Sequence, residues 1–158
     1  EVGVAVATVG AVPDRREYVG NVRAANAVDV RARVRGYLRA RRYVEGQPVA
    51  AGDVLFEIDP SSYEVQLAAA RAQLAEARAT RLRAEQDFAR TKELFGKGVV
   101  SKAVLDQQRD ERDVGAAAEQ SAEAAVAAAQ LDLSYCTVRA PFAGQIGRSL
   151  VDPGNLVG

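Results

Sequence analysis

The chain is 158 residues long and carries 21 basic and 21 acidic side chains, so its formal net charge at neutral pH is zero. It contains no histidine, no methionine and a single cysteine, Cys136. This composition excludes disulfides within the chain and lacks the residue most often used as metal ligand and general base. The charge balance gives no indication of nucleic acid as a partner. We therefore expect a non-enzymatic protein without catalytic, cofactor-binding or metal-binding residues, in which Cys136 is a buried apolar residue.

Residues 1–60 show the alternation of apolar and polar side chains that is typical of β-strands. The apolar positions of this alternation are Val2, Val4 and Val6, and later Val28, Val30, Ala32 and Val34. Pro13-Asp14, Gly46 and Gly52 interrupt the pattern, as residues of turns do. We expect a β segment over residues 1–26 and a β unit over residues 27–60.

Two stretches rich in alanine, arginine and glutamate follow, over about 61–95 and about 101–134, and they predict two long helices. Pro60 and the sequence Ser61-Ser-Tyr-Glu64 have the form of a capping box at the start of the first helix. The intervening Gly96–Val100 is long enough only for a reversal, so the helices are predicted to form an antiparallel hairpin, with Gly96 ending the first helix. At about 1.5 Å rise per residue, each arm should be roughly 50 Å long.

Apolar side chains repeat along both predicted helices with the seven-residue spacing of a coiled coil. On the first arm these are Leu67, Leu74, Phe88 and Phe95, with Ala70, Ala77 and Ala84 beside them. On the second arm they are Leu105, Val126 and Leu133, with Ala122 and Ala129 beside them. Arg81 interrupts the first series, and Arg112 and Glu119 weaken the second. The remaining charged side chains are expected to face solvent.

The region from residue 135 to the end returns to β character and repeats residues 27–60. Arg31–Leu38 aligns without a gap to Arg139–Ile146, and Val49–Leu55 aligns to Val151–Val157. Each half alone has too few strands to bury its apolar face, so the halves are predicted to pack together as one small barrel or sandwich. The helices between them must leave and return at the same place.

Glycines coincide in the two halves of the repeat. Gly36 aligns with Gly144, and Gly52 aligns with Gly154. Each lies between short apolar runs, where a tight turn often needs a positive φ. We therefore expect all four to be structural turn residues.

The motifs Arg33-Val-x-Gly36, Glu45-Gly-Gln-x-Val49-x-x-Gly52-x-x-Leu55-Phe-x-Ile-Asp-Pro60 and Arg139-Ala-Pro-Phe-x-Gly144 resemble those of the periplasmic adaptor, or membrane-fusion, proteins of tripartite efflux pumps. The resemblance covers about residues 20–158. It implies an α+β fold, with a lipoyl-like β module of two half-motifs, 27–60 and 135–158, interrupted by an antiparallel coiled-coil hairpin over 61–134. Residues 1–26 would belong to a barrel or membrane-proximal domain. The family continues into such domains, so we expect the chain to be a piece of a longer adaptor.

Arg90, Leu94 and Ser101, spaced four and seven residues apart, resemble the family's tip motif for docking to a TolC-like outer-membrane channel. Judged from the residues alone, Arg90 and Leu94 share one helix face, and Ser101 is placed to cap the second helix. The resemblance also implies self-association, commonly into a hexameric ring, and location in the periplasm at the inner membrane. It further implies a role in drug export with an inner-membrane transporter. The arm length is similar to that of adaptors for resistance-nodulation-division transporters, although an ATP-driven transporter stays open.

Two other functions fit part of the sequence. A lipoyl or biotinyl carrier would need a lysine at a turn between the two β halves, and the chain has no lysine before Lys92. A coiled-coil scaffold or chaperone would explain the helices but would leave the repeated β halves unexplained. Modification of a lysine would favour the carrier, and binding of unfolded chains by a stable monomer would favour the scaffold.

Overall fold

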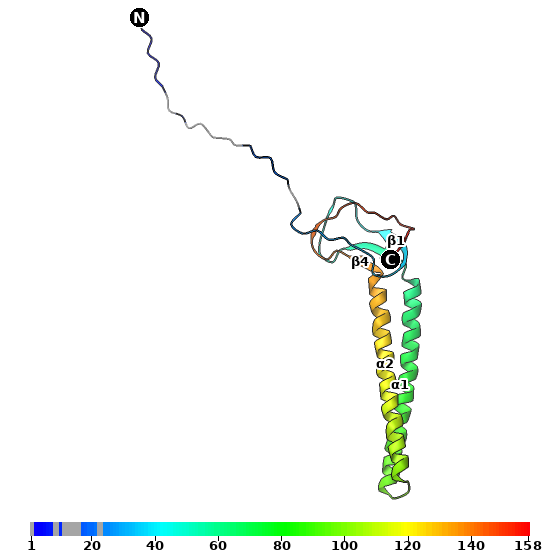
Figure 1. Cartoon of the computed structure of the whole chain (residues 1–158). Helices are drawn as coiled ribbons and strands as arrows, with labels where there is room; N and C mark the ends of the chain where they lie inside the picture. The colour runs from blue at the N-terminus through cyan, green and yellow to red at the C-terminus, as the bar shows by residue number, and fades with distance from the viewer. Residues whose placement is uncertain (1, 8–9, 11–16, 22–23) are drawn as a thin grey trace.

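A small β module carries a long helical hairpin in this computed structural model, which describes residues 2–7, 10, 17–21 and 24–158 (Figure 1). The elements are β1 (Gly36–Arg41), β2 (Pro48–Val49), β3 (Val54–Ile58), α1 (Ser61–Gly96), α2 (Lys102–Tyr135), β4 (Thr137–Arg139), β5 (Gly144–Gln145) and β6 (Leu156–Val157). The two helices lie side by side in opposite directions and connect β3 with β4. The predicted α+β fold, with a hairpin inserted into a β module, is thus confirmed.

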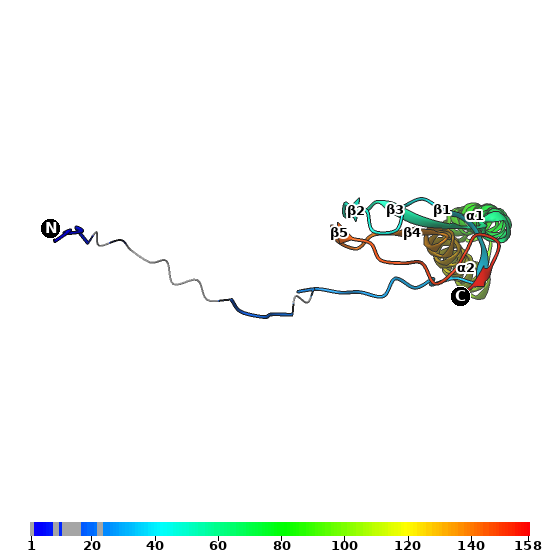
Figure 2. The ribbon, with the colours of Figure 1, turned by 90° about the horizontal axis from the view of Figure 1, so that it is seen from above.

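The strands of the two sequence repeats interlock in two antiparallel sheets. One sheet has four strands in the order β4-β3-β1-β6, and the other consists of β2 and β5. Strands β1, β2 and β3 come from the first repeat and pair with β6, β5 and β4 of the second. Viewed from above, β2 and β5 lie at the end of the module away from the helices (Figure 2). Each repeat therefore supplies the hydrogen-bonding partners that the other lacks.

The module has two small apolar clusters. One contains Val34, Ile58 and Cys136 and packs against Tyr63 and Leu133 of the two helices. The other contains Tyr43, Leu55 and Ala140. The first cluster therefore joins the base of both hairpin arms to the sheet, while the second closes the half of the module that includes β2 and β5. Burying these side chains is the main stabilising contribution that so small a module has.

Leu55 is the most buried large side chain of the second cluster, with 1% of its surface exposed. Nearby, the Tyr43 and Phe56 rings meet edge to face at 5.3 Å between centroids. Aromatic pairs in this geometry add to the stabilisation that burial alone provides.

Much of the β structure predicted before Gly36 is not formed in the described residues. Residues 2–7, 10, 17–21 and 24–35 make no strand, and the rest of the predicted segment 1–26 lies outside the described part. Val28 is 53% exposed, whereas Val34 is buried, so only the end of the alternation reaches the core. An alternating sequence forms a strand only where another strand satisfies its backbone groups, and residues 28–34 have no such neighbour here.

The start of α1 differs from the predicted capping box. Pro60 occupies the N-cap position, and no side chain caps the helix there. Instead, the Asp59 Oδ1 atom accepts hydrogen bonds from the backbone N–H of Ser61 at 3.1 Å and from its hydroxyl at 2.6 Å. These bonds lower the pKa of the Asp59 carboxyl. The carboxylate also lies where the positive end of the helix dipole favours negative charge.

Two of the four predicted turn glycines have the expected backbone conformation. Gly52 has φ 89° and Gly154 has φ 96°. Gly36 and Gly144 do not have a positive φ, which corrects the prediction for both. Gly36 lies within β1, where a Cβ atom would be 2.6 Å from Ile58 Cγ2, so the position requires a small residue. At Gly144, which opens β5, a Cβ would make only ordinary contacts with the Phe142 ring, 3.7 Å away.

Candidate functional site at the hairpin tip

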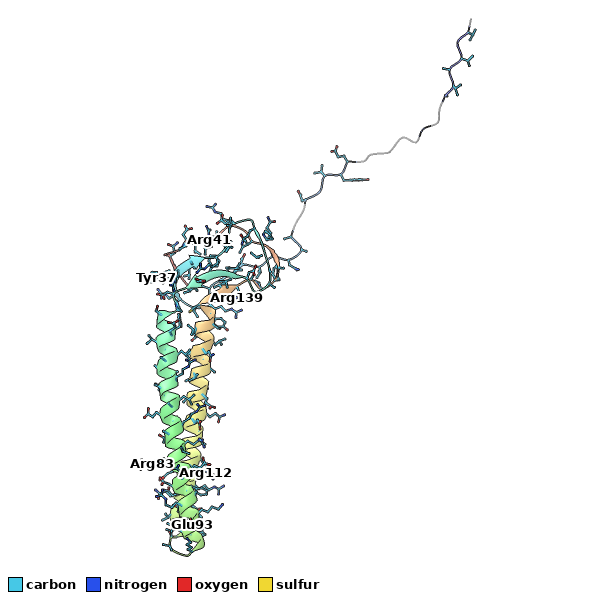
Figure 3. The ribbon with its side chains drawn as sticks, turned by 180° about the vertical axis from the view of Figure 1, so that it is seen from behind. Tyr37, Arg41, Arg83, Glu93, Arg112 and Arg139 are labelled. Atoms are coloured by element: carbon cyan, nitrogen blue, oxygen red, sulfur yellow. The ribbon has the colours of Figure 1, made fainter. Side chains whose placement is uncertain are left out.

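The two arms pack along most of the predicted seam. Leu67 and Ala70 are buried, and the other seam residues are half-buried, namely Leu74, Ala77, Ala84, Phe88, Leu105, Ala122, Val126, Ala129 and Leu133. Phe95, predicted to continue the seam, is 40% exposed, and Leu94 is half-buried in its place. The arms consist of 36 and 34 residues, which corresponds to about 50 Å at about 1.5 Å per residue. The tip is therefore held far from the β module (Figure 3).

A compact turn closes the hairpin at its far end. The backbone N–H of Gly98 donates to the Phe95 carbonyl at 2.9 Å, and that of Val99 donates to the Leu94 carbonyl at 3.0 Å. Gly98 has φ 73°, a left-handed conformation that costs little for glycine, so the helix ends at Gly96 but reverses at Gly98. These bonds satisfy the last carbonyls of α1 and give the turn a defined conformation.

Arg90, Leu94 and Ser101 all lie in the last two turns of α1 or at the start of α2. The Arg90 side chain is 71% exposed and forms an ion pair with Asp87 at 3.4 Å. Ser101 occupies the N-cap position of α2, and its hydroxyl oxygen accepts from the backbone N–H of Val104 at 3.4 Å. The tip therefore presents an exposed guanidinium, which its ion pair with Asp87 holds only weakly, beside the partly covered Leu94.

The sequence analysis did not predict that two apolar residues would be exposed at the tip. Val99 is 67% exposed and Phe95 is 40% exposed, and both lie within the turn that the hydrogen bonds above define. A sequence signal exists, because apolar residues flanked by the turn glycines Gly96 and Gly98 have no core to enter. The surface formed by Arg90, Leu94, Phe95, Val99 and Ser101 is called the tip surface below.

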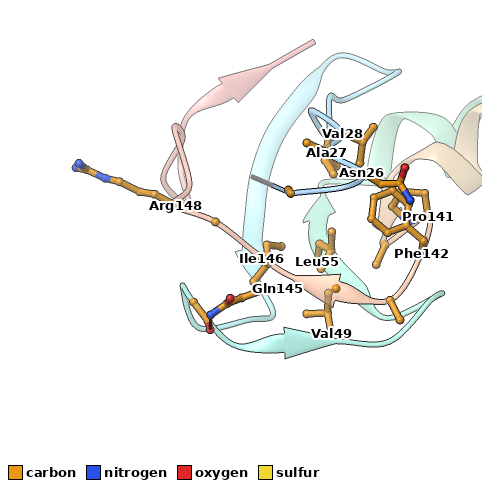
Figure 4. Close-up of a pocket in the computed structure, with 17 residues that line it drawn as sticks. Asn26, Ala27, Val28, Val49, Leu55, Pro141, Phe142, Gln145, Ile146 and Arg148 are labelled. Carbon is orange, nitrogen blue, oxygen red and sulfur yellow. Dashed lines mark hydrogen bonds between the residues drawn. The ribbon is translucent and has the colours of Figure 1, made fainter. Parts of the chain in front are cut away.

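The β module has an apolar groove of about 810 Å³, which is lined by residues of both repeats and includes Leu55. Figure 4 shows Ile146 and Phe142 beside it, while the guanidinium of Arg148 points away. Among the described residues no group of three potential metal ligands comes together. The sequence of both repeats contains no lysine, so a lipoyl or biotinyl group has no attachment point in the module.

No helix in the described part of the chain is long and apolar enough to cross a lipid bilayer. Both long helices instead have charged outer faces and partly buried inner faces.

Cys136 lies at the base of α2 and is buried, with 3% of its surface exposed. Burial raises the pKa of its thiol, and the neighbouring carboxylates of Asp59, Asp132 and Glu64 add to the effect. A higher pKa leaves less of the reactive thiolate at neutral pH. This is the behaviour of a packing residue.

Comparisons with known proteins identify the family of the chain. Residues 26–158 match the family model described as RND MFP, barrel-sandwich hybrid domain. The multidrug resistance protein MdtA of Klebsiella pneumoniae is 44% identical over 156 residues, which are 99% of this chain and 38% of that protein. MdtA of Escherichia coli is 42% identical, with the same shares covered. The chain therefore spans 38% of the length of these curated relatives.

Solved structures share the fold. A MacA-MexA chimera that contains the Pseudomonas aeruginosa MexA α-hairpin superposes with a TM-score of 0.59 and 33% identity, over 85% of this chain and 43% of the chimera. MacA of Actinobacillus actinomycetemcomitans gives a TM-score of 0.57 and 29% identity, over 85% of this chain and 46% of that one. With its interlocked β repeats, inserted hairpin and family match over residues 26–158, the chain belongs to the RND membrane-fusion proteins, in the region of their barrel-sandwich hybrid domain.

Proposed function

We propose that this chain is the channel-facing part of a periplasmic adaptor, which bridges an inner-membrane transporter and a TolC-like outer-membrane channel. The observation that carries the proposal is the tip surface, held about 50 Å from the β module by two long arms and built around Arg90, Leu94 and Ser101. The adaptor performs no chemistry. Its role is to bring two membrane proteins together.

The physical character of the tip surface supports docking to protein. Arginine is one of the residues that are enriched at interaction hot spots. The Arg90 guanidinium has several donors that can bind carboxylates or backbone carbonyls of a partner. Val99 and Phe95 add apolar area that becomes buried when a second surface covers it. A helical hairpin of a channel is a suitable partner, because two hairpin ends can pack with interdigitating side chains.

The proposed setting follows from the family. MdtA carries the name of a multidrug resistance protein, so drug export is the proposed process, with a transporter of the resistance-nodulation-division type. We place the chain in the periplasm, associated with the inner membrane, as one subunit of a ring that is commonly hexameric. A lipoyl or biotinyl carrier is not favoured, because the module has no lysine. Nor is a scaffold or chaperone, since the match extends across both β repeats.

The test is chemical cross-linking between the adaptor and its channel in cells that produce the whole pump. The double variant Arg90→Ala/Leu94→Ala is expected to lose the cross-linked product and the drug resistance that the pump confers. Arg71→Ala is the matched control, because Arg71 is an exposed arginine farther up the same arm, away from Asp87, the ion-pair partner of Arg90. Circular dichroism should show unchanged helix in both variants. Normal cross-linking by a folded double variant would overturn the proposal.

A further inference from the structure

The middle of the hairpin contains a layer of charged side chains between the two arms. Arg78 Nε contacts Glu119 Oε1 at 3.0 Å, and Arg81 Nε meets Glu119 Oε2 as an ion pair. The Glu119 side chain is only 17% exposed and the Arg81 side chain 35% exposed, so water covers little of this contact. A single carboxylate of α2 is therefore held between two guanidiniums of α1. We call Arg78, Arg81, Glu119 and Gly115 the central layer.

Gly115 is what allows the arms to approach at this level. It is the buried residue of α2, and a Cβ atom there would lie 3.2 Å from the Cα atom of Arg81. The backbones of the two helices therefore touch at the position where a larger residue would separate them. With no side chain from Gly115 in the way, the Arg81 side chain can run along the seam toward Glu119. The close approach of the backbones at Gly115 thus leaves room for the ion pair.

Further charges surround the central layer without replacing it. Arg78 also contacts Glu123 at 2.9 Å, and Arg81 also contacts Glu85 at 2.6 Å. Arg78 and Glu123 are 57% and 51% exposed, so their pairing is weakened by water and salt. Glu119 is the least exposed member and joins both arginines. Its removal would leave Arg81 Nε, which is already buried and without a hydrogen bond, with no facing carboxylate.

The central layer divides the hairpin into two parts of unequal packing. On the module side the seam is apolar and includes Leu67 and Ala70, the two buried residues of α1. On the tip side, no apolar side chain of the seam is fully buried. There Arg112 lies over the Phe88 ring, 4.5 Å from its centroid. Between the central layer and the tip, the apolar seam residues are half-buried, namely Ala84, Phe88, Leu94 and Leu105.

From this arrangement we propose that Glu119, paired with Arg78 and Arg81 over Gly115, is a positioning residue for the tip. It keeps the tip-side halves of α1 and α2 paired, so that Arg90, Leu94 and Ser101 form one surface. The proposed link from the central layer to docking rests on the proposed adaptor function. The proposed effect of the central layer on the pairing of the arms is independent of that function.

Hydrogen exchange of the isolated adaptor tests the pairing directly. Glu119→Ala is expected to raise exchange of backbone amides in residues 84–112 by about tenfold, while residues 63–77 and 122–133 change little. Alanine favours helix more than glutamate, so a rise cannot come from helix propensity. Glu76→Ala is the matched control, an exposed glutamate of α1 outside the central layer. Equal exchange in the two variants, or a rise of the same size in both parts of the hairpin, would overturn the proposal.

A second pair of variants separates ion pairing from simple structural damage. Gly115→Leu should act as a wedge that also raises exchange on the tip side, although leucine is a good helix former. In Arg81→Leu/Glu119→Leu an apolar pair replaces the buried ion pair, which often keeps or increases stability. This double variant should therefore recover at least half of the lost protection. Failure of the double variant to recover any protection would show that pairing across the seam is not what positions the tip.

Channel cross-linking then distinguishes the two proposals. If the wild-type adaptor cross-links to the channel, Glu119→Ala should reduce the yield and Arg81→Leu/Glu119→Leu should restore it. An unchanged yield despite increased exchange would overturn the positioning role and leave docking intact. Absence of any wild-type product would instead overturn the proposed function, while the exchange result would still decide whether the central layer holds the arms together.

Discussion

The hydroxyl group of Tyr63 donates a hydrogen bond to the backbone carbonyl of Arg35 at 2.8 Å, which links the first turn of α1 to the chain just before β1. The two residues are 28 positions apart in the sequence. The Tyr63 ring also packs against the cluster of Val34, Ile58 and Cys136. A hydrogen bond and an apolar contact at one residue together fix the direction in which the hairpin leaves the module.

Tyr63→Phe should weaken this connection while it keeps the ring in place. We expect a loss of about 1 kcal/mol in the free energy of unfolding, the usual value of one hydrogen bond, measured by urea denaturation. Spin labels on the module and the tip should also show a broader distribution of distances. Tyr37→Phe is the control, because Tyr37 is 62% exposed on β1. Equal stability of the two variants would contradict the role given to Tyr63.

Arg42 and Glu57 form a two-point ion pair, Nε to Oε1 and Nη2 to Oε2, both at 2.9 Å. The hydrogen bonds from Arg42 lower the pKa of Glu57 below its ordinary 4.5. A carboxyl with a lowered pKa in the folded state stabilises the fold above its unfolded pKa, and this contribution is lost as the pH falls through the lowered value.

Arg42→Gln should therefore lower the melting temperature at neutral pH and make the decline below about pH 4.5 less steep. Some decline should persist, since the lowered pKa of Asp59 contributes in the acid range as well. Melting curves from about pH 7 to about pH 3 would measure both effects, with Glu76→Gln as control. A difference between wild type and Arg42→Gln that stays constant over the whole range would contradict the assignment.

Gly36→Ala tests the close approach of β1 and β3. The added Cβ would lie 2.6 Å from Ile58 Cγ2, and Ile58 is only 2% exposed, so it has little room to move. Overpacking of this kind costs about 1–3 kcal/mol. Gly147→Ala is the matched control, since a Cβ there has nothing within 4 Å. If urea denaturation showed the same stability for both variants, the explanation of Gly36 by size would be wrong.

The thiol of Cys136 provides a probe of the module. Because the thiol is buried and its pKa is raised, alkylation at neutral pH should be slow until the module opens. Ser62→Cys in a Cys136→Ala background supplies an exposed thiol for comparison. We expect the exposed thiol to react at least about a hundredfold faster under native conditions and both thiols to react alike in denaturant. Similar native rates would contradict the burial of Cys136.

The hairpin and the interlocked repeats could be predicted because their signals are local or internal to the sequence. Long stretches almost free of glycine and proline define the arms, and Gly96 and Gly98 leave room only for a reversal. The repeat predicted that the two β halves pack together as one module. Predictions failed where the formation of an element depends on pairing with another part of the chain. The alternation before Gly36 forms no strand, because it has no strand beside it in the described structure.

The pairing of charges in the central layer could not be predicted from the sequence either, because it depends on which residues of the two arms face each other. Arg81 and Glu119 read as interruptions of two apolar series, because a charge within a seam is unfavourable when each helix is considered alone. The seven-residue spacing along one arm does not tell which of its residues face which residues of the other arm. Once Gly115 brings the backbones into contact, the two charges pair across the seam.

Docking of the hairpin tip on the channel is tested most directly by photo-cross-linking. A single reactive residue is placed in the hairpin of the adaptor, in cells that contain the whole pump. Val99, 67% exposed in the tip turn, and Val65, 69% exposed near the module, offer two similar positions at opposite ends. We expect a covalent product with the outer-membrane channel from position 99 and none from position 65. A channel product from position 65, or none from position 99, would contradict docking at the tip.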